Sequence, residues 1–179
     1  MDLEALSVII PLQDLVRIFE PWQSAYSNSK VLPTAVTAVH LSALLFGGGL
    51  AVTTDRTMLR ALRAGPAQRD QQLVEVHAAH RIVLAALALM FVSGVLMATA
   101  DVKTFLTTPA FYVKLGFVTL LVLNGAALTL TETRLRRGAT SAHGEDGARL
   151  WRRLRMTCVC SMLLWGATLV AGVTLANVA

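Results

Sequence analysis

The uncharged run from Val31 to Val52 limits what this chain can fold into. It reads VLPTAVTAVHLSALLFGGGLAV and holds 22 residues without Asp, Glu, Lys or Arg. A helix rises about 1.5 Å per residue, so the run would cover about 33 Å, enough to cross the hydrocarbon core of a bilayer. A helix of a soluble core is usually shorter and keeps a polar face. We therefore predict a membrane-spanning helix here.

Three further apolar runs follow, and together the four predict spans at about 31–52, 78–100, 109–130 and 156–178. The composition agrees, because 55% of the residues are hydrophobic and only 15% are charged. All but three of the sixteen Lys and Arg residues are arginine, and most follow the first and third runs. Basic loops face the cytoplasm, so both termini are expected on the outer side. This distribution argues against a nucleic-acid partner.

Residues 1–30 are expected to form a separate segment at the outer face of the membrane that the chain spans. Four apolar residues recur at helical spacing between polar neighbours, which predicts a short amphipathic helix: Leu12, Leu15, Val16 and Phe19. Trp22 and Tyr26 follow, and both residue types favour the headgroup level. The predicted fold is therefore all-α, with residues 31–179 forming an antiparallel four-helix transmembrane bundle behind this interfacial helix.

His40 is an ionisable residue at membrane depth, where such groups are costly and mark candidate functional sites. Counted from the outer ends of the spans at about 1.5 Å per residue, His40 lies about 13 Å deep. Met90 comes at about 15 Å and Lys114 at about 6 Å, so both are candidates for a site with His40. His40 and His80 are both candidate metal ligands. His80 falls at about 30 Å, however, so the two residues do not lie at the same depth.

Each candidate has a structural alternative. His40 could instead hydrogen-bond a neighbouring hydroxyl or carbonyl group, and Lys114 could extend its amine to the headgroups. His77 and His80 are three residues apart, a spacing that suits a second haem or a quinone near the cytoplasm, or two solvated side chains.

Small residues in the spans predict close packing against a membrane-protein partner or a second copy of the chain. The four residues are Ala43, Gly47, Gly94 and Gly116. The Gly47–Gly49 triplet suits close approach of a helix or a flat ligand. It is not a phosphate-binding loop, because no strand precedes it and no Gly-Lys-Ser/Thr follows it.

Several motifs resemble known membrane proteins: Pro33 with His40, the segment LLFGGGLAVTTDR, and PAFYVKLGFVTLLVLN. The pattern resembles a group of uncharacterised bacterial four-helix membrane proteins. It is more distantly similar to the copper-resistance D-like family and to membrane haem-dependent protoporphyrinogen oxidases. The similarity to the oxidases implies a functional pair formed by His40 and Lys114. The chain departs from the oxidase pattern in its N-terminal segment and in HAAHR. The resemblance implies a place in the bacterial inner membrane.

We interpret the chain as a membrane protein that binds haem b and transfers electrons, alone or as a subunit of a respiratory complex. His40 would be an axial ligand and Lys114 a partner of the haem propionates, with Met90 as a possible second ligand. Three other hypotheses fit the same residues. They are a haem-dependent porphyrinogen oxidase, a copper-resistance D-like transport protein, and a cofactor-free structural subunit. The sequence assigns no catalytic residue and leaves open whether the chain is an enzyme.

Overall fold

The computed structural model describes residues 12–137 and 145–178, and this part of the chain is all-α, as predicted. It contains α1 (Leu12–Asn28), α2 (Val31–Ala64), α3 (Pro66–Ala100), α4 (Val102–Thr107), α5 (Pro109–Arg137) and α6 (Glu145–Val178). Helices α2, α3, α5 and α6 are each long and apolar enough to cross a membrane. They indicate a multi-pass membrane protein.

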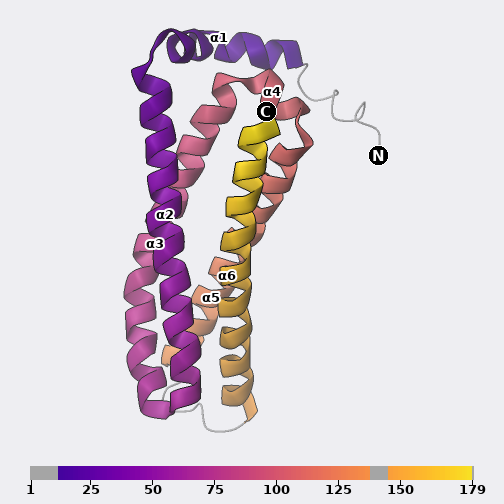
Figure 1. Ribbon diagram of the computed structural model, residues 1–179. Helices are drawn as coiled ribbons and strands as arrows, with labels where there is room; N and C mark the ends of the chain where they lie inside the picture. Colours follow the sequence, from indigo (N-terminus) through magenta and orange to yellow (C-terminus); the bar gives the residue numbers. More distant parts are fainter. Residues whose placement is uncertain (1–11, 138–144, 179) are drawn as a thin grey trace, which may run out of the picture.

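The four long helices lie side by side, and consecutive ones run in opposite directions (Figure 1). Helix α1 lies across one end of them, and α4 forms part of the connection between α3 and α5 at that same end (Figure 1). Helices α2 and α3 pack along their length, as do α5 and α6, and α2 joins the two pairs through α6. Helices α3 and α5 make few contacts, so the structure consists of two hairpins that are joined on one side.

The long helices extend well beyond the predicted spans at the end opposite α1. Helix α2 does not stop near Asp55 but continues to Ala64, and α3 begins at Pro66 rather than near residue 78. Gly65 alone separates them, with φ of 137°, a backbone conformation that favours glycine. The apolar runs match the thickness of a bilayer, but a helix continues until a residue such as Gly65 interrupts it.

The third connection is also shorter than predicted. The sequence indicates a loop over residues 138–147, of which 138–144 lie outside the described residues. Glu145 to Gly147 belong to the first turn of α6. Residues 1–11 of the predicted interfacial segment also lie outside the described part, and the rest of that segment is mostly α1.

Helix α1 is attached to the bundle through an aromatic residue. The Trp22 indole Nε1 donates a hydrogen bond of 3.1 Å to the carbonyl oxygen of Leu96 in α3. Its ring lies 5.4 Å from that of Tyr26, between centroids. The two residues expected at the headgroup level thus lie beside the α3–α4 end of the bundle. At that end, Asp101 Oδ1 accepts a hydrogen bond from the Thr104 backbone N–H and caps α4.

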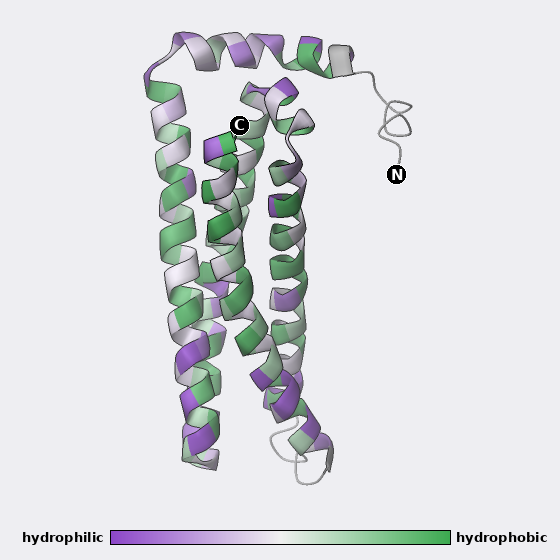
Figure 2. Ribbon diagram, turned by 45° about the vertical axis from the view of Figure 1, so that its right-hand side comes forward, coloured by the Kyte–Doolittle hydropathy of each residue, from purple (hydrophilic) through white to green (hydrophobic). Residues whose placement is uncertain are grey.

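The surface of the long helices is rich in exposed apolar side chains. Large examples occur on every one of them: Leu45, Phe46, Phe91, Leu123, Leu163 and Val170. Figure 2 shows a mostly hydrophobic middle, with hydrophilic residues gathered at the end opposite α1 and on α1 itself. Soluble monomers rarely expose contiguous apolar surface of this extent, so the arrangement is consistent with a lipid environment.

Two apolar clusters fill the interior. The first lies around the middle of the bundle and contains Ala43, Ala51, Leu87, Met90, Leu121 and Trp165. The second lies toward the end opposite α1 and contains Met58, Leu73, Val76, Leu128, Leu135, Leu154 and Cys158. The second cluster explains why the helices continue past the apolar runs, because these residues bury against one another there.

The glycine triplet of α2 lets two other helices approach closely. A Cβ atom at Gly47 would lie 2.6 Å from Cβ of Ala86 in α3, and one at Gly48 would lie 2.9 Å from the Trp165 ring of α6. Gly49 has nothing within 4 Å of that position. Of the small residues expected to face a partner protein, Ala43 and Gly47 are instead buried within the chain.

We expect Gly47→Ala to destabilise the protein and Gly49→Ala to leave it unchanged or slightly more stable. The added methyl group at 47 forces α2 and α3 apart, which costs about 1–3 kcal/mol. At 49 it meets open space, and alanine favours a helix by up to about 1 kcal/mol. Thermal unfolding in detergent, followed by circular dichroism, measures both. Equal effects of the two substitutions would contradict the close approach.

Candidate functional site

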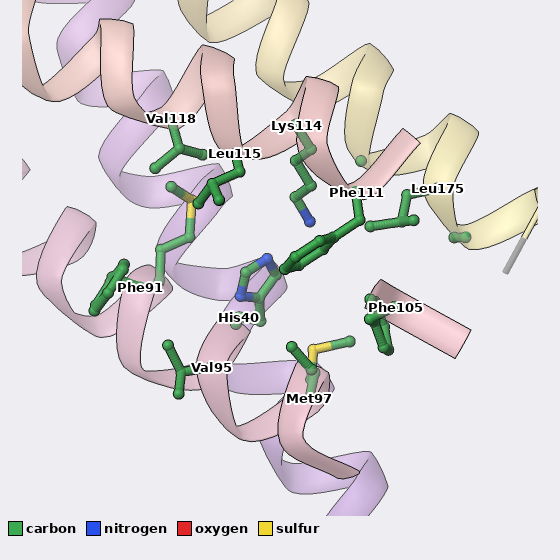
Figure 3. A pocket seen from close by; sticks show the side chains of 15 residues that line it. His40, Phe91, Val95, Met97, Phe105, Phe111, Lys114, Leu115, Val118 and Leu175 are labelled. Carbon is green, nitrogen blue, oxygen red and sulfur yellow. The ribbon is translucent and has the colours of Figure 1, made fainter. Parts of the chain in front are cut away.

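A cavity of about 190 Å³ lies in the half of the bundle near α1 and α4. Every long helix contributes to its wall, and α4 contributes Phe105. The polar groups in the lining are His40 of α2 and Lys114 of α5, and the other side chains are aliphatic, aromatic or thioether. Figure 3 shows the His40 ring and the Lys114 amine extending toward each other inside it.

The hydrogen bonds around His40 fix which ring nitrogen faces the cavity. His40 Nδ1 lies 2.9 Å from Ser93 Oγ of α3. The Ser93 hydroxyl has one proton, and its Oγ lies only 2.7 Å from the Leu89 carbonyl oxygen, to which it donates. Ser93 therefore accepts from His40, and Nδ1 carries the ring proton. The unprotonated Nε2 of this buried imidazole then lies on the cavity side, free to bind a metal or accept a hydrogen bond.

Two glycines lie close to these polar groups. A Cβ atom at Gly94 would lie 3.4 Å from His40 Cε1, at van der Waals contact with the imidazole. One at Gly172 of α6 would lie 3.6 Å from Lys114 Nζ. No carboxylate of the described chain lies within 4 Å of Lys114, whose charge is therefore available to an anionic group in the cavity.

The cavity brings together three of the predicted site residues, His40, Met90 and Lys114. The sequence predicted that Met90 lies level with His40 and that Lys114 lies nearer the outer face. In the structure all three line the same cavity. Sequence reasoning missed Ser93, Phe105 and Phe111. A hydroxyl one turn beyond Met90 was the available signal for Ser93.

The other two predicted residues lie elsewhere. His80 borders a second cavity, of about 40 Å³, with Asp55 and Ser161. His77 Nδ1 lies 2.8 Å from Glu132 Oε1, and Arg136 Nη1 lies 3.8 Å from the same oxygen. His40 and His80 thus share no cavity, in agreement with their calculated depths. Within the described ranges, no group of three or more His, Cys, Asp or Glu residues is placed to hold a metal ion.

Two buried carboxylates were not anticipated. Asp55 of α2 is 3% exposed and faces Ser161 and Cys158 of α6. Glu132 of α5 is fully buried. Asp55 stands next to Arg56 in the sequence and Glu132 two residues before Arg134, where a carboxylate is expected at the interface. They are buried because the rotation of α2 and α5 about their own axes points these two side chains toward neighbouring helices.

No family model matches the chain, and no curated protein or solved structure is significantly similar to it. The resemblance to copper-resistance D-like proteins and to haem-dependent oxidases therefore stays a prediction. Function has to be inferred from the cavity, where a neutral imidazole nitrogen and an ammonium group face one apolar space. These groups suit a flat apolar molecule with a metal or carbonyl group near its centre and a negative charge at its edge.

Phe91 and Val95 of α3 and Leu115 of α5 line the cavity and are exposed. We infer that the cavity opens between α3 and α5, the two helices that make few contacts with each other. A cavity of about 150 Å³ is known to admit benzene, so this one holds a one-ring group as it stands. A larger ligand requires α3 and α5 to separate, and little packing between them opposes that movement.

Proposed function

We propose that the chain forms an antiparallel four-helix transmembrane bundle in a bacterial inner membrane. Helix α1 lies at the outer interface, and the basic ends of the long helices face the cytoplasm. The arginines that follow the first and third apolar runs support this orientation, because basic segments stay on the cytoplasmic side. The His40 cavity then lies in the outer half of the bilayer.

We propose further that this cavity binds a b-type haem and that the protein transfers electrons through it. The observation that carries the proposal is the buried His40, whose Nδ1–H is bound by Ser93 while Nε2 faces an apolar space. Imidazoles that ligate metals use one nitrogen while the other donates to a neighbouring acceptor. The haem would supply a one-electron couple, tuned by its ligands and its dry surroundings.

The surrounding residues fit the same cofactor chemically. Lys114 provides a cation for a propionate, and Met90 is a thioether in the lining of the same cavity, a group known as an axial ligand. The described volume is smaller than most ligand pockets, which span about 300–1,000 Å³, so binding would widen the gap between α3 and α5. The protein's role would be to hold the iron, compensate the propionate charge and exclude water.

The volume of the cavity favours a second candidate, a lipid-soluble quinone. A one-ring head group fits about 190 Å³ without movement, and the gap between α3 and α5 would let an isoprenoid tail extend into the lipid. His40 Nε2 and the Lys114 ammonium would then contact the two oxygen-bearing edges of the ring. In this second candidate function, the same cavity would bind a quinone instead of a haem.

Absorbance spectra of protein purified from its native membrane distinguish the two. We expect a Soret band, and α and β bands that sharpen when dithionite is added, with about one haem per chain. A colourless protein that releases a quinone on solvent extraction would replace the haem with the second candidate. A protein free of both would contradict the proposal of electron transfer.

We expect Ser93→Ala to weaken haem retention by about 10–100-fold, the usual effect of removing the partner of a ligating histidine. Without the Ser93 hydroxyl, the His40 ring loses the acceptor that fixes its orientation and its protonated nitrogen. The rate of haem transfer to an excess of a haem-scavenging globin measures retention. Ser42→Ala is the matched control, because Ser42 is exposed on α2. Equal rates in the two variants would contradict the role of Ser93.

A further inference from the structure

A groove of about 460 Å³ lies at the opposite end of the molecule, between the α2–α3 turn and the start of α6. Four arginines line it: Arg63, Arg69, Arg152 and Arg155. Its remaining surface is apolar, with Trp151 at one side and Val159 at one end. The groove joins the two hairpins of the fold, because α2 and α3 form one wall and α6 the other.

The positive charge of this groove is not balanced within the described part of the chain. None of its four arginines has a carboxylate within 4 Å there. Arg69 is held in place, because Nη2 donates to the Leu62 carbonyl oxygen at 2.7 Å and its guanidinium lies 5.7 Å from the centre of the Trp151 ring. Its buried Nε has no hydrogen-bond partner in that part of the chain. The groove is thus a partly preorganised site for an anion.

The groove also crosses the boundary of the predicted membrane. Val159 belongs to the last apolar run, Arg155 immediately precedes that run, and Arg152 lies about one turn farther out. Arg63 stands near the end of α2, beyond the first apolar run. An occupant would therefore meet an apolar surface at one end and guanidinium groups at the other.

We propose that this groove binds an anionic phospholipid of the cytoplasmic leaflet. The phosphate lies among the arginines, and an acyl chain follows Leu59 and Val159 toward the hydrocarbon. Guanidinium groups bind phosphate oxygens through paired hydrogen bonds, and basic pockets between membrane helices on the cytoplasmic side suit anionic head groups. The bound lipid bridges α6 to the α2–α3 hairpin. The inference uses the membrane placement of the helices and is independent of the cofactor at His40.

Native mass spectra of the protein in detergent, titrated with phosphatidylglycerol or phosphatidylcholine, test the proposal. The wild type is expected to retain one phosphatidylglycerol molecule in preference to phosphatidylcholine. The variant Arg63→Gln/Arg152→Gln/Arg155→Gln should bind phosphatidylglycerol at least about 100-fold more weakly, since each lost charge-assisted hydrogen bond to the phosphate is worth about tenfold. All three side chains are exposed, so their replacement should leave the fold intact.

The matched control removes three exposed arginines from outside the groove, as Arg56→Gln/Arg81→Gln/Arg134→Gln. It should lower phosphatidylglycerol affinity by less than about threefold, because these side chains do not line the groove and their attraction to the phosphate is screened by salt. Equal losses in both triple variants, equal binding of the two lipids, or displacement by excess inorganic phosphate would each overturn the proposal. If the groove variant loses its helical circular dichroism, Arg152→Gln/Arg155→Gln is compared with Arg81→Gln/Arg134→Gln, and the same comparison decides.

Discussion

Replacing His40 with alanine is expected to remove the haem absorbance of the purified protein almost completely. His40 provides the only nitrogen ligand among the described residues that line the cavity, since Lys114 is a cation beside it. Without the imidazole, the cavity would keep its apolar walls but lose the bond that we propose for the iron. The Soret band per unit of protein, compared with a pyridine haemochrome assay for total haem, measures this loss.

Two variants make the test specific for ligation. His80→Gln should leave the spectrum unchanged, because His80 borders the other cavity, with Asp55. His40→Gly should regain absorbance when free imidazole is added, since the small ligand can occupy the space that the side chain vacates. An unchanged spectrum in His40→Ala would assign the iron to another residue. Equal loss in His80→Gln would favour a more general effect on folding.

Much of the fold could be predicted because membrane helices must satisfy their backbone hydrogen bonds internally. Four apolar runs of bilayer length therefore predict four helices. The α2–α3 turn lies at Gly65–Pro66, a pair of residue types that commonly marks a helix boundary. The lengths of the helices were not predicted, because residues such as Met58 and Leu154 are buried by contacts between helices at the arginine-rich end. Hydropathy along one segment does not contain those contacts.

The sequence could predict how deep each site residue lies along its helix, but not which way each helix is rotated about its axis. A rise of about 1.5 Å per residue was enough to bring His40, Met90 and Lys114 near one another. The bond from His40 to Ser93 depends on how α2 and α3 turn about their own axes, which the apolar sequence around them does not reveal. For the same reason Glu132, among polar and basic neighbours, gave no sign that its carboxylate is fully buried.

Removing the imidazole of His77 is expected to destabilise the protein by about 3 kcal/mol. His77 Nδ1 lies 2.8 Å from an oxygen of Glu132, whose side chain is fully buried while that of His77 is half exposed. Loss of one partner leaves a buried carboxylate uncompensated, which costs about 3–5 kcal/mol. Arg136, at 3.8 Å from the same oxygen, limits the effect to the lower part of this range. Unfolding of His77→Ala in detergent, followed by circular dichroism, measures it.

The double variant His77→Ala/Glu132→Leu should be more stable than His77→Ala alone. Leucine has a similar volume to glutamate, and it removes the buried charge that His77→Ala leaves without its partner. Glu75→Ala is the control, since this exposed carboxylate should contribute no more than about 0.5 kcal/mol. If the double variant is less stable by the sum of the two single effects, His77 and Glu132 are not coupled. The buried carboxylate would then be stabilised mainly by Arg136, and the contact with His77 would contribute little.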